Sequence, residues 1–191
     1  MPRLLKRKDV VEVFRTLLVP DEAREHVWDI DLERLLQAGY NTFLLDVDRT
    51  LLGHNERVMS LQHVNWIQKC KTYGFNVYFI SNNRSRKRIK KVAEQVDCSG
   101  VYCAIKPLIM GAKQLEETYK VDFKKCIIVG DQVFKDTVLG NWLEIYNILV
   151  EPLDNPLPLF SRLQYEFERY LVKRLTTEAP NKVDSKEEPG I

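Results

Sequence analysis

The stretch "FLLDVDRTLLGHN", which runs from Phe43 to Asn55, decides how the rest of the sequence is read. Its first residues suit a buried strand, and Asp46 and Asp48 follow that strand with a single valine between them. Two carboxylates this close repel each other unless a cation or a shared proton offsets their charge. The end of this strand is therefore a candidate site for a cation.

The composition is that of one globular domain with a full hydrophobic core. The chain has 191 residues, of which 45% are hydrophobic and 29% are charged. A formal net charge of +2 gives no argument for binding nucleic acid, so we expect no nucleic-acid partner. No apolar run approaches the roughly 18 residues of a membrane span, and the N-terminus lacks a signal-peptide core.

The four cysteines do not form a CxxC pair, so their spacing does not suggest a zinc site. Cys70 and Cys126 lie in apolar or helical patterns and are expected in the core. A reducing cytosol is the simplest compartment for such a chain, and we expect a cytoplasmic protein.

Five short apolar runs, separated by helical patterns, predict the sheet. Most are apolar at successive residues, which is typical of parallel strands covered on both faces. Strand–helix alternation of this kind predicts an α/β fold: a Rossmann-like, doubly wound, mostly parallel sheet of about five strands. The expected strands are Thr42–Val47, Asn76–Ile80, Val101–Ile105, Cys126–Gly130 and Ile145–Val150.

Helical periodicity predicts four helices between these strands, two before the first strand and one after the last. They are expected at Val58–Tyr73, Ser85–Val96, Leu108–Tyr119, Phe134–Leu143, Arg3–Leu18, Asp31–Leu36 and Ser161–Leu175. We expect residues 1–175 to form a single domain with a helical lead-in. Residues 176–191 are polar and proline-containing, and we expect a disordered tail.

Polar side chains stand where the strands end, although the strand interiors are apolar. In open α/β sheets, ligands bind outside the carboxyl ends of the strands. Residues that follow different strands therefore meet at one edge, and the sequence predicts one site there. The candidates are Asp46, Asp48, Thr50, Ser81, Asn82, Lys106, Asp131 and Asp136.

The acidic residues of this set suit phosphoryl transfer. Asp46, Asp48 and Asp131 offer hard oxygen ligands of the kind that Mg²⁺ prefers. Asp46 is placed to act as a nucleophile and form an aspartyl phosphate. Asp48 points to the same side and can serve as general acid and then as general base.

The remaining candidates suit the phosphate group. Ser81 and the backbone amides around Asn82 are expected to bind phosphate oxygens, and Lys106 to neutralise charge on the transferring group. Each residue also has a structural explanation. Ser81 can be a turn residue, Lys106 a solvated loop residue, and Asp136 the start of a helix.

Four motifs in order resemble those of the haloacid dehalogenase (HAD) phosphatases. "LLDVDRT" is similar to their DxDxT signature, and "FISNN", "IKP" and "VGDQVFKD" are similar to their second, third and fourth motifs. The lead-in "LVPDEAREHVWDIDLERLLQAGYNTFLLDVD" and "GDQVFKDTVLGN" resemble the YqeG-type branch of HAD subclass IIIA, which is related to phosphatidylglycerophosphate phosphatases. The resemblance covers roughly the first 155 residues.

This resemblance implies Mg²⁺, an aspartyl-phosphate intermediate and the roles described above. It places Thr50 with Ser81 and Asn82 among the phosphate-binding residues, and it makes Asp136 a support for the metal site or for Lys106. One position departs from the branch, which commonly has asparagine where this chain has Arg49. Arg49 either reaches an anionic substrate or points to solvent, and it bears on substrate preference.

The spacing leaves no room for a cap domain. The helix after the first motif begins soon after Asp48, and the segment between Ser81 and Lys106 holds only one helix and one strand. An open site suits a phosphate carried by something large, such as a lipid head group, a protein or a nucleic acid. With the family resemblance, the best single substrate is phosphatidylglycerophosphate. The alternatives are a soluble or protein-borne phosphate ester, or a metal-dependent binding or regulatory module with little turnover.

Two segments bear on a membrane partner. The run "NNRSRKRIKK" is a helix start with a cationic outer face, and "RLLKRKDVVEVFRTLL" combines basic residues with one apolar stripe. Each is explained either by a solvated or core-packed helix, or by peripheral contact with an anionic membrane. The sequence leaves both explanations open.

Overall fold

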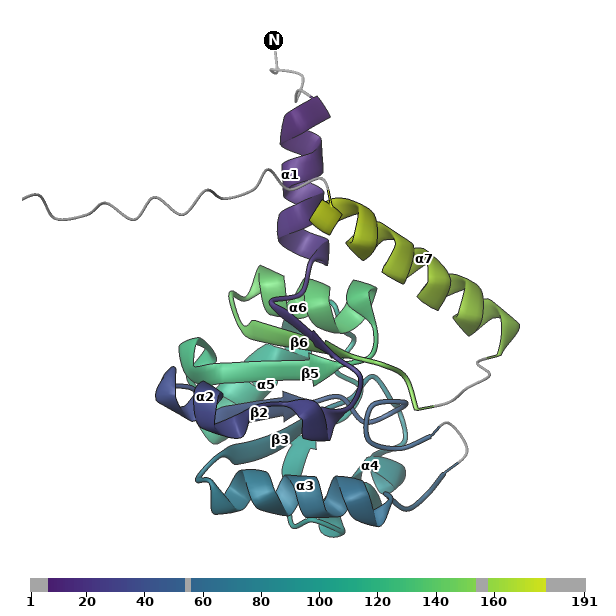
Figure 1. Cartoon of the computed structure of the whole chain (residues 1–191). Coiled ribbons are helices and arrows are strands. Elements are labelled where there is room, and N and C mark those ends of the chain that lie inside the picture. Colours follow the sequence, from purple (N-terminus) through teal and green to yellow (C-terminus); the bar gives the residue numbers. More distant parts are fainter. Residues whose placement is uncertain (1–6, 54–55, 154–157, 178–191) are drawn as a thin grey trace, which may run out of the picture.

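The computed structural model describes residues 7–53, 56–153 and 158–177, which form a parallel sheet between two layers of helices (Figure 1). The sheet has six strands in the order β1-β6-β5-β2-β3-β4, and every neighbouring pair is parallel. The predicted Rossmann-like α/β class is confirmed. The strands are β1 (Glu22–Arg24), β2 (Thr42–Leu45), β3 (Asn76–Ile80), β4 (Ser99–Val101), β5 (Cys126–Gly130) and β6 (Tyr146–Val150).

The helices follow the predicted alternation, with small shifts at their ends, and residues 3–6 of the predicted helix Arg3–Leu18 lie outside the described residues. They are α1 (Arg7–Leu18), α2 (Leu32–Gln37), α3 (Leu61–Thr72), α4 (Arg86–Glu94), α5 (Met110–Tyr119), α6 (Val138–Trp142) and α7 (Leu159–Thr177). Short 3-10 turns occupy Val27–Asp29 and Phe123–Lys125, and a π-helical turn, Val133–Thr137, precedes α6. Across the described ranges, no separate cap domain stands over the sheet.

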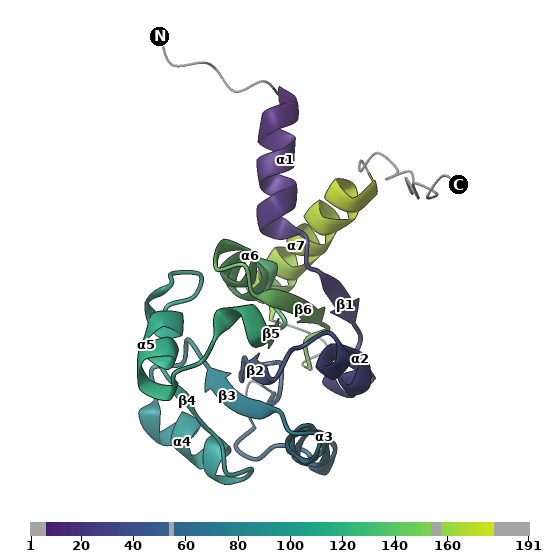
Figure 2. The same cartoon turned by 90° about the vertical axis from the view of Figure 1, so that its left-hand side faces the viewer.

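The core lies on both faces of the sheet, which explains the unbroken apolar runs. In β2, Phe43 and Leu45 face the cluster that includes side chains of α2, α3 and α4. Leu44 faces the opposite cluster, which includes side chains of α5 and α6. Figure 2 shows α2 and α3 on one side of the sheet and α5 and α6 on the other. All three β2 residues are fully buried, so the strand that carries the first motif is held rigidly.

The predicted strand at Val101–Ile105 is wrong in position, because the observed strand is Ser99–Val101. After Val101 the chain leaves the sheet and turns back toward β3. The backbone amide of Ala104 donates to the carbonyl of Ser81 at 2.9 Å. Tyr102, Cys103 and Ile105 of this turn are exposed, and the apolar composition of the run does not distinguish it from a strand. The turn carries Lys106 to the carboxyl edge of the sheet.

The edge strand β1 was not predicted. It has only three residues, two of them charged, and an edge strand lacks the apolar run of a buried one. The strand is anchored by Asp21, whose Oδ2 accepts hydrogen bonds from the backbone amide and the side-chain amide of Asn147, both at 2.8 Å. Asn147 is buried in β6, so this contact ties the lead-in to the sheet.

The first and last helices meet at one end of the molecule. Leu18 of α1 and Leu175 of α7 pack with Val133 and Leu149 in a third apolar cluster. Beyond this contact α1 projects away from the sheet (Figures 1 and 2). None of the described helices is long and apolar enough to cross a membrane.

The predicted boundary at residue 175 lies close to the end of the described chain. Helix α7 continues to Thr177, two residues past it, and residues 178–191 of the expected tail lie outside the described residues. The assignment of residues 1–175 to a single domain stays a prediction.

Replacing Asp21 by alanine tests the anchor of β1. We expect Asp21→Ala to lower the free energy of unfolding by about 1–3 kcal/mol, because the buried Asn147 amides lose their acceptor. Urea denaturation measures the change. Asp21→Asn keeps an oxygen at the accepting position and should stay close to the unmodified protein. Equal stability of Asp21→Ala and the unmodified protein would contradict the anchoring role.

Candidate active site

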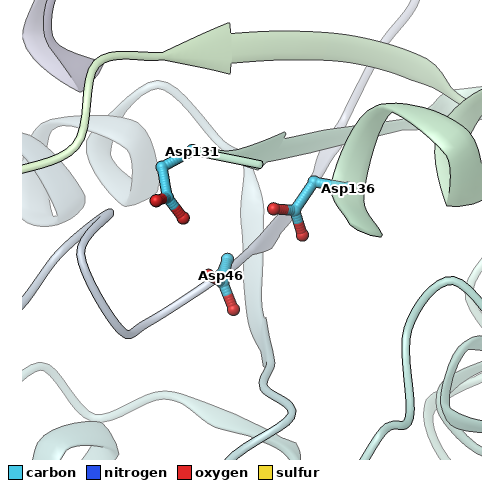
Figure 3. Close-up of side chains that lie close together, drawn as sticks. All are labelled: Asp46, Asp131 and Asp136. Atoms are coloured by element: carbon cyan, nitrogen blue, oxygen red, sulfur yellow. The ribbon is translucent and has the colours of Figure 1, made fainter. Parts of the chain in front are cut away.

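Three buried carboxylates converge at the carboxyl edge of the sheet. Asp46 directly follows β2, Asp131 directly follows β5, and Asp136 comes from the π-helical turn (Figure 3). One oxygen of each side chain lies within 4.8 Å of the others. Carboxylate oxygens grouped in this way suit a hard divalent cation such as Mg²⁺. The donor set therefore fits the cation that the motifs imply.

A glycine and a π-helical turn bring Asp136 into this group. A Cβ atom on Gly130 would lie 2.2 Å from Cγ of Asp136, so only glycine allows this close approach. The Oδ2 atom of Asp136 accepts a hydrogen bond from the backbone amide of Gln132 at 3.2 Å. π-Helical turns inside helices occur frequently at functional sites.

The turn is supported from the far end of the chain by Glu168 of α7. This side chain is buried, and its Oε2 accepts a hydrogen bond from the backbone amide of Val133 at 2.8 Å. Glu168 is not predicted from the sequence, because nothing in a helical pattern marks a glutamate whose partner lies 35 residues earlier.

Lys106 joins two of the three carboxylates. Its Nζ donates to Oδ1 of Asp46 at 2.7 Å and to Oδ1 of Asp136 at 2.6 Å, and the side chain is only 1% exposed. The explanation of Lys106 as a solvated loop residue is excluded. Its position matches the expected role, since the ammonium group lies beside the candidate nucleophile.

Asn82 holds the Lys106 loop in place. Its side-chain amide donates to the carbonyl of Lys106 at 3.0 Å, and its Oδ1 accepts from the Lys106 backbone amide at 2.6 Å. The Asn82 side chain is thus engaged with the loop. Any phosphate contact at Asn82 falls to its backbone, as the sequence analysis expected.

The two hydroxyl candidates are both buried near the acids. The Oγ atom of Ser81 accepts a hydrogen bond from the backbone amide of Asn83 at 3.0 Å. The Oγ1 atom of Thr50 has no hydrogen-bond partner among the described residues. A buried hydroxyl in this state is a candidate for contact with a ligand. The phosphate-binding roles of Thr50, Ser81 and Asn82 stay predictions.

Asp48 lies beside the carboxylate cluster but belongs to a different network. Its Oδ1 accepts from Nη2 of Arg88 at 2.8 Å, and its Oδ2 accepts from Nδ2 of Asn83 at 2.9 Å. The side chain is 29% exposed and faces the same cavity as Asp46. This position suits proton exchange with a bound substrate. A direct metal contact by Asp48 stays a prediction.

Arg88 and Asn83 are residues that the sequence analysis did not assign to the site. Both lie in the basic segment at the start of α4, and that run of charge was the available signal. Asn83 directly follows the predicted phosphate-binding pair. Neither spacing nor charge alone indicates that these two side chains hold Asp48.

Arg49 turns into the site and does not point to solvent. Its Nε lies 3.3 Å from Oδ2 of Asp131, and its side chain is 15% exposed. Its φ of 69° places it in the left-handed region, which asparagine adopts more readily than arginine. The guanidinium thus forms a charge pair with one of the candidate metal ligands.

Burial and mutual repulsion shift the titration of the carboxylates. Burial raises the pKa of Asp46 to about 6, although the nearby Lys106 opposes this shift. Burial and the neighbouring Asp46 and Asp136 raise the pKa of Asp131 to about 7, and Arg49 opposes them. Burial disfavours the charge of Lys106, but Asp136 and Asp46 outweigh it and raise the pKa of that ammonium group. A divalent cation would relieve the same repulsion.

Asp46 of the cluster lines a cavity of about 440 Å³, which is large enough for the head of a phosphate ester. Its lining includes Asp46, Asp48, Arg49, Arg88 and Lys106. The start of α7 also contributes to its wall. The site therefore has acidic groups for a cation and basic groups for an anion within one open pocket.

The pKa shifts predict that the effect of Mg²⁺ on stability depends on pH. Aspartates titrate near pH 4 in an unfolded chain, and here at about 6 for Asp46 and about 7 for Asp131. Between these values the folded state holds protons that the unfolded state has released, so these groups contribute less stability as pH rises. Mg²⁺ binds the ionised form, so the rise in Tm on adding MgCl2 should be larger at pH 8 than at pH 5.

Differential scanning fluorimetry with and without MgCl2 measures this rise. Asp131→Asn should remove most of it, and Asp97→Asn, which changes an exposed aspartate away from the cluster, should retain it. An increase in Tm that is the same at pH 5 and pH 8 would contradict the prediction.

Arg49→Asn tests competition between the guanidinium and the cation for Asp131. We expect the Kd for Mg²⁺ to fall on the order of fivefold, the effect of about 1 kcal/mol for removing a charge pair. Isothermal titration calorimetry measures the Kd. Arg49→Lys keeps the positive charge and should bind Mg²⁺ nearly as the unmodified protein does. An unchanged Kd in Arg49→Asn would show that Arg49 does not compete.

Comparison with models of protein families finds none that matches the chain. Among curated proteins, the chain is 24% identical over 163 residues to "Probable phosphatase YqeG" of Bacillus subtilis (strain 168), covering 85% of this chain and 94% of that protein. It is also 24% identical over 184 residues to "Phosphatidylglycerophosphate phosphatase 1, chloroplastic/mitochondrial" of Arabidopsis thaliana. This second match covers 92% of the chain but only 53% of the plant protein.

Among solved structures, an uncharacterized protein from Listeria monocytogenes serotype 4b has a similar fold. The TM-score is 0.50 at 16% sequence identity, and the match covers 72% of this chain and 99% of that one. The fold similarity agrees with the α/β architecture described above. The predicted resemblance to HAD phosphatases of the YqeG type is confirmed by the sequence similarity to YqeG, which extends over most of both chains.

Proposed function

We propose that this protein is a Mg²⁺-dependent phosphomonoester hydrolase that works through an aspartyl phosphate on Asp46. The observation that carries the proposal is the contact of Lys106 with Asp46 inside a cluster of buried carboxylates at the sheet edge. A nucleophile, a neighbouring ammonium group and a set of metal ligands are what phosphoryl transfer requires, since it depends mainly on positioning and charge.

In the first step a carboxylate oxygen of Asp46 attacks phosphorus, and the bond from phosphorus to the leaving oxygen breaks. Asp48 donates a proton to that leaving oxygen, so the alcohol departs neutral. In the second step water attacks the phosphorus of the aspartyl phosphate and gives a proton to Asp48. Inorganic phosphate leaves, and the carboxylate of Asp46 is regenerated.

The other residues of the site hold the phosphate and offset its charge. Lys106 lies next to Asp46 and neutralises charge on the transferring group. The buried hydroxyl groups of Thr50 and Ser81 would contact its oxygens. Asp46, Asp131 and Asp136 would hold Mg²⁺, with Asp48 as a further candidate. When bound, Mg²⁺ supplies positive charge to the phosphate oxygens.

The proposed substrate is a lipid-linked phosphate monoester, with phosphatidylglycerophosphate as the best single candidate. Support comes from the open site, which has no cap over it within the described ranges, and from the similarity to the plant phosphatase of that name over about half of its length. Arg49 and Arg88 add positive charge to the cavity wall, which suits a substrate with a second anionic group. We place the protein in the cytoplasm, in peripheral contact with an anionic membrane.

Phosphate release from an aryl phosphate tests the reaction. Asp46→Asn should lower kcat on the order of 10³-fold or more, because the nucleophile is lost, and EDTA should have a similar effect. Asp97→Asn is the matched control and should stay near full activity. Retained turnover in Asp46→Asn would contradict the aspartyl-phosphate mechanism.

The substrate is tested separately, with phosphatidylglycerophosphate in detergent micelles. A higher kcat/KM for the lipid than for every member of a panel of soluble esters supports the lipid assignment. Release from soluble esters alone would make the lipid assignment wrong and favour a soluble substrate. Bound Mg²⁺ with no release from any ester would favour a binding or regulatory module.

A further inference from the structure

Helix α7 carries a row of large apolar side chains that stay more than half exposed among the described residues, although one of them, Phe167, also contacts the ring of Phe134. After the adjacent pair that begins the helix, they recur every three or four residues, so they lie along one side of it. These residues form the α7 stripe, with exposed fractions of 77% for Leu159, 82% for Phe160, 62% for Leu163, 54% for Phe167 and 56% for Tyr170. A contiguous apolar surface of this kind marks a site of interaction.

Apart from the contact of Phe167 with Phe134, the stripe is not the face by which α7 packs on its own domain. That face carries Glu168, which hydrogen-bonds the π-helical turn, and Leu175, which is buried in the cluster with α1. A further flank of the helix is charged, with Arg162 paired to Glu166. Helix α7 thus has its packing satisfied and still exposes five large apolar side chains.

The α7 stripe begins at the mouth of the candidate active site. Pro158 and Ser161 line the cavity that holds Asp46, and Leu159 and Phe160 lie between them in the chain. Figure 1 shows the first turn of α7 on the side of the molecule where β2 and β5 end. An object that bound the stripe would therefore lie next to the opening of the site.

A cationic hollow borders the same mouth from the other side. It has a volume of about 440 Å³, and four basic side chains and one serine line it: Arg57, Ser85, Lys87, Arg88 and Lys91. Arg88 also lines the active-site cavity, so the two hollows adjoin. The mouth of the site thus lies between an apolar stripe and a cationic hollow.

We propose that the α7 stripe inserts into the interfacial layer of an anionic phospholipid bilayer, with the cationic hollow on the lipid phosphates and the site mouth facing the membrane. Apolar side chains beside clustered lysine and arginine are the combination that binds such a surface. A second copy of the chain fits less well, because a two-fold contact across this face brings two cationic hollows together. The role of this docking rests on the proposed function, but the docking itself requires no hydrolysis.

Sedimentation of the full chain with vesicles tests the apolar half of this surface. The triple variant Phe160→Ser/Leu163→Ser/Tyr170→Ser, which spares Phe167 because its ring contacts Phe134, should lower partitioning into phosphatidylglycerol–phosphatidylcholine vesicles by about tenfold or more, because three inserted side chains are lost. The control Arg162→Ser/Glu166→Ser changes the charged flank of the same helix and should bind as the unmodified protein does.

The cationic half is tested with Lys87→Ser/Lys91→Ser. This variant should bind anionic vesicles more weakly by about tenfold and show a smaller dependence on salt, since each basic residue near the surface adds to the attraction. The control Lys113→Ser removes an exposed lysine of α5, outside the hollow, and should bind normally. Equal binding of all variants to vesicles with and without phosphatidylglycerol would overturn the charge assignment.

Hydrolysis of a soluble aryl phosphate measures catalysis without a membrane, so it distinguishes a loss of catalysis from a loss of docking. The triple variant should retain this activity, and Asp46→Asn should retain vesicle binding. Vesicle binding that depends on the α7 stripe, without hydrolysis of any ester, would support the docking and contradict the proposed function. Hydrolysis without vesicle binding would leave the function standing and overturn the docking.

Light scattering after gel filtration tests whether a second copy of the chain binds the α7 stripe. The proposal would be overturned if the unmodified protein does not bind vesicles and forms a dimer, whereas the triple variant is a monomer. This result would assign the stripe to contact between copies.

Discussion

The repulsion among three buried carboxylates is the constraint on which the rest of the site depends. Asp46, Asp131 and Asp136 lie within 4.8 Å of one another, where their charges cannot all persist unbalanced. Lys106 offsets part of this charge by contacting two of the three. The parallel sheet holds the strand ends together against this repulsion. The favourable free energy of packing the core thus maintains a site that favours a dication.

The surrounding basic groups divide the acids into separately balanced sets. Arg49 faces Asp131 and Arg88 faces Asp48, whereas Lys106 serves Asp46. In each pair the carboxylate competes with an anionic ligand for the arginine. The arginine can therefore bind the ligand more strongly when another positive charge, such as a bound cation, neutralises the carboxylate. Binding of a cation at the carboxylates and binding of an anion at the arginines should for this reason favour each other.

Much of the fold and of the site could be predicted from the sequence, because buried parallel strands have a simple apolar signature. Asp46, Lys106 and Asp131 follow such strands or a tight turn after one, and the topology brings them together. The strand at Val101–Ile105 was misplaced because the apolar sequence of this turn resembles that of a strand. The edge strand β1 escaped notice because it is short and polar, and its anchor through Asn147 joins residues far apart in the sequence.

The contacts that hold the site were less predictable than the residues that form it. The side chains that hold the site hydrogen-bond to residues far from them in the sequence, and their spacing follows no motif. They are Arg88 and Asn83, which contact Asp48, and Glu168, which contacts the amide of Val133. Inward-facing Arg49 illustrates the same limit, since its direction is set by a left-handed backbone turn.

The bond from Glu168 to the amide of Val133 has a consequence for the extent of the catalytic unit. All four motifs lie before residue 137, and the last strand ends at Val150. A fragment that stopped there would keep each motif residue but leave the turn that carries Asp136 without its acceptor. The shortest fragment that keeps the supported turn therefore extends past the last motif into α7. The helix that lines the entrance of the site thus also stabilises the turn that carries Asp136.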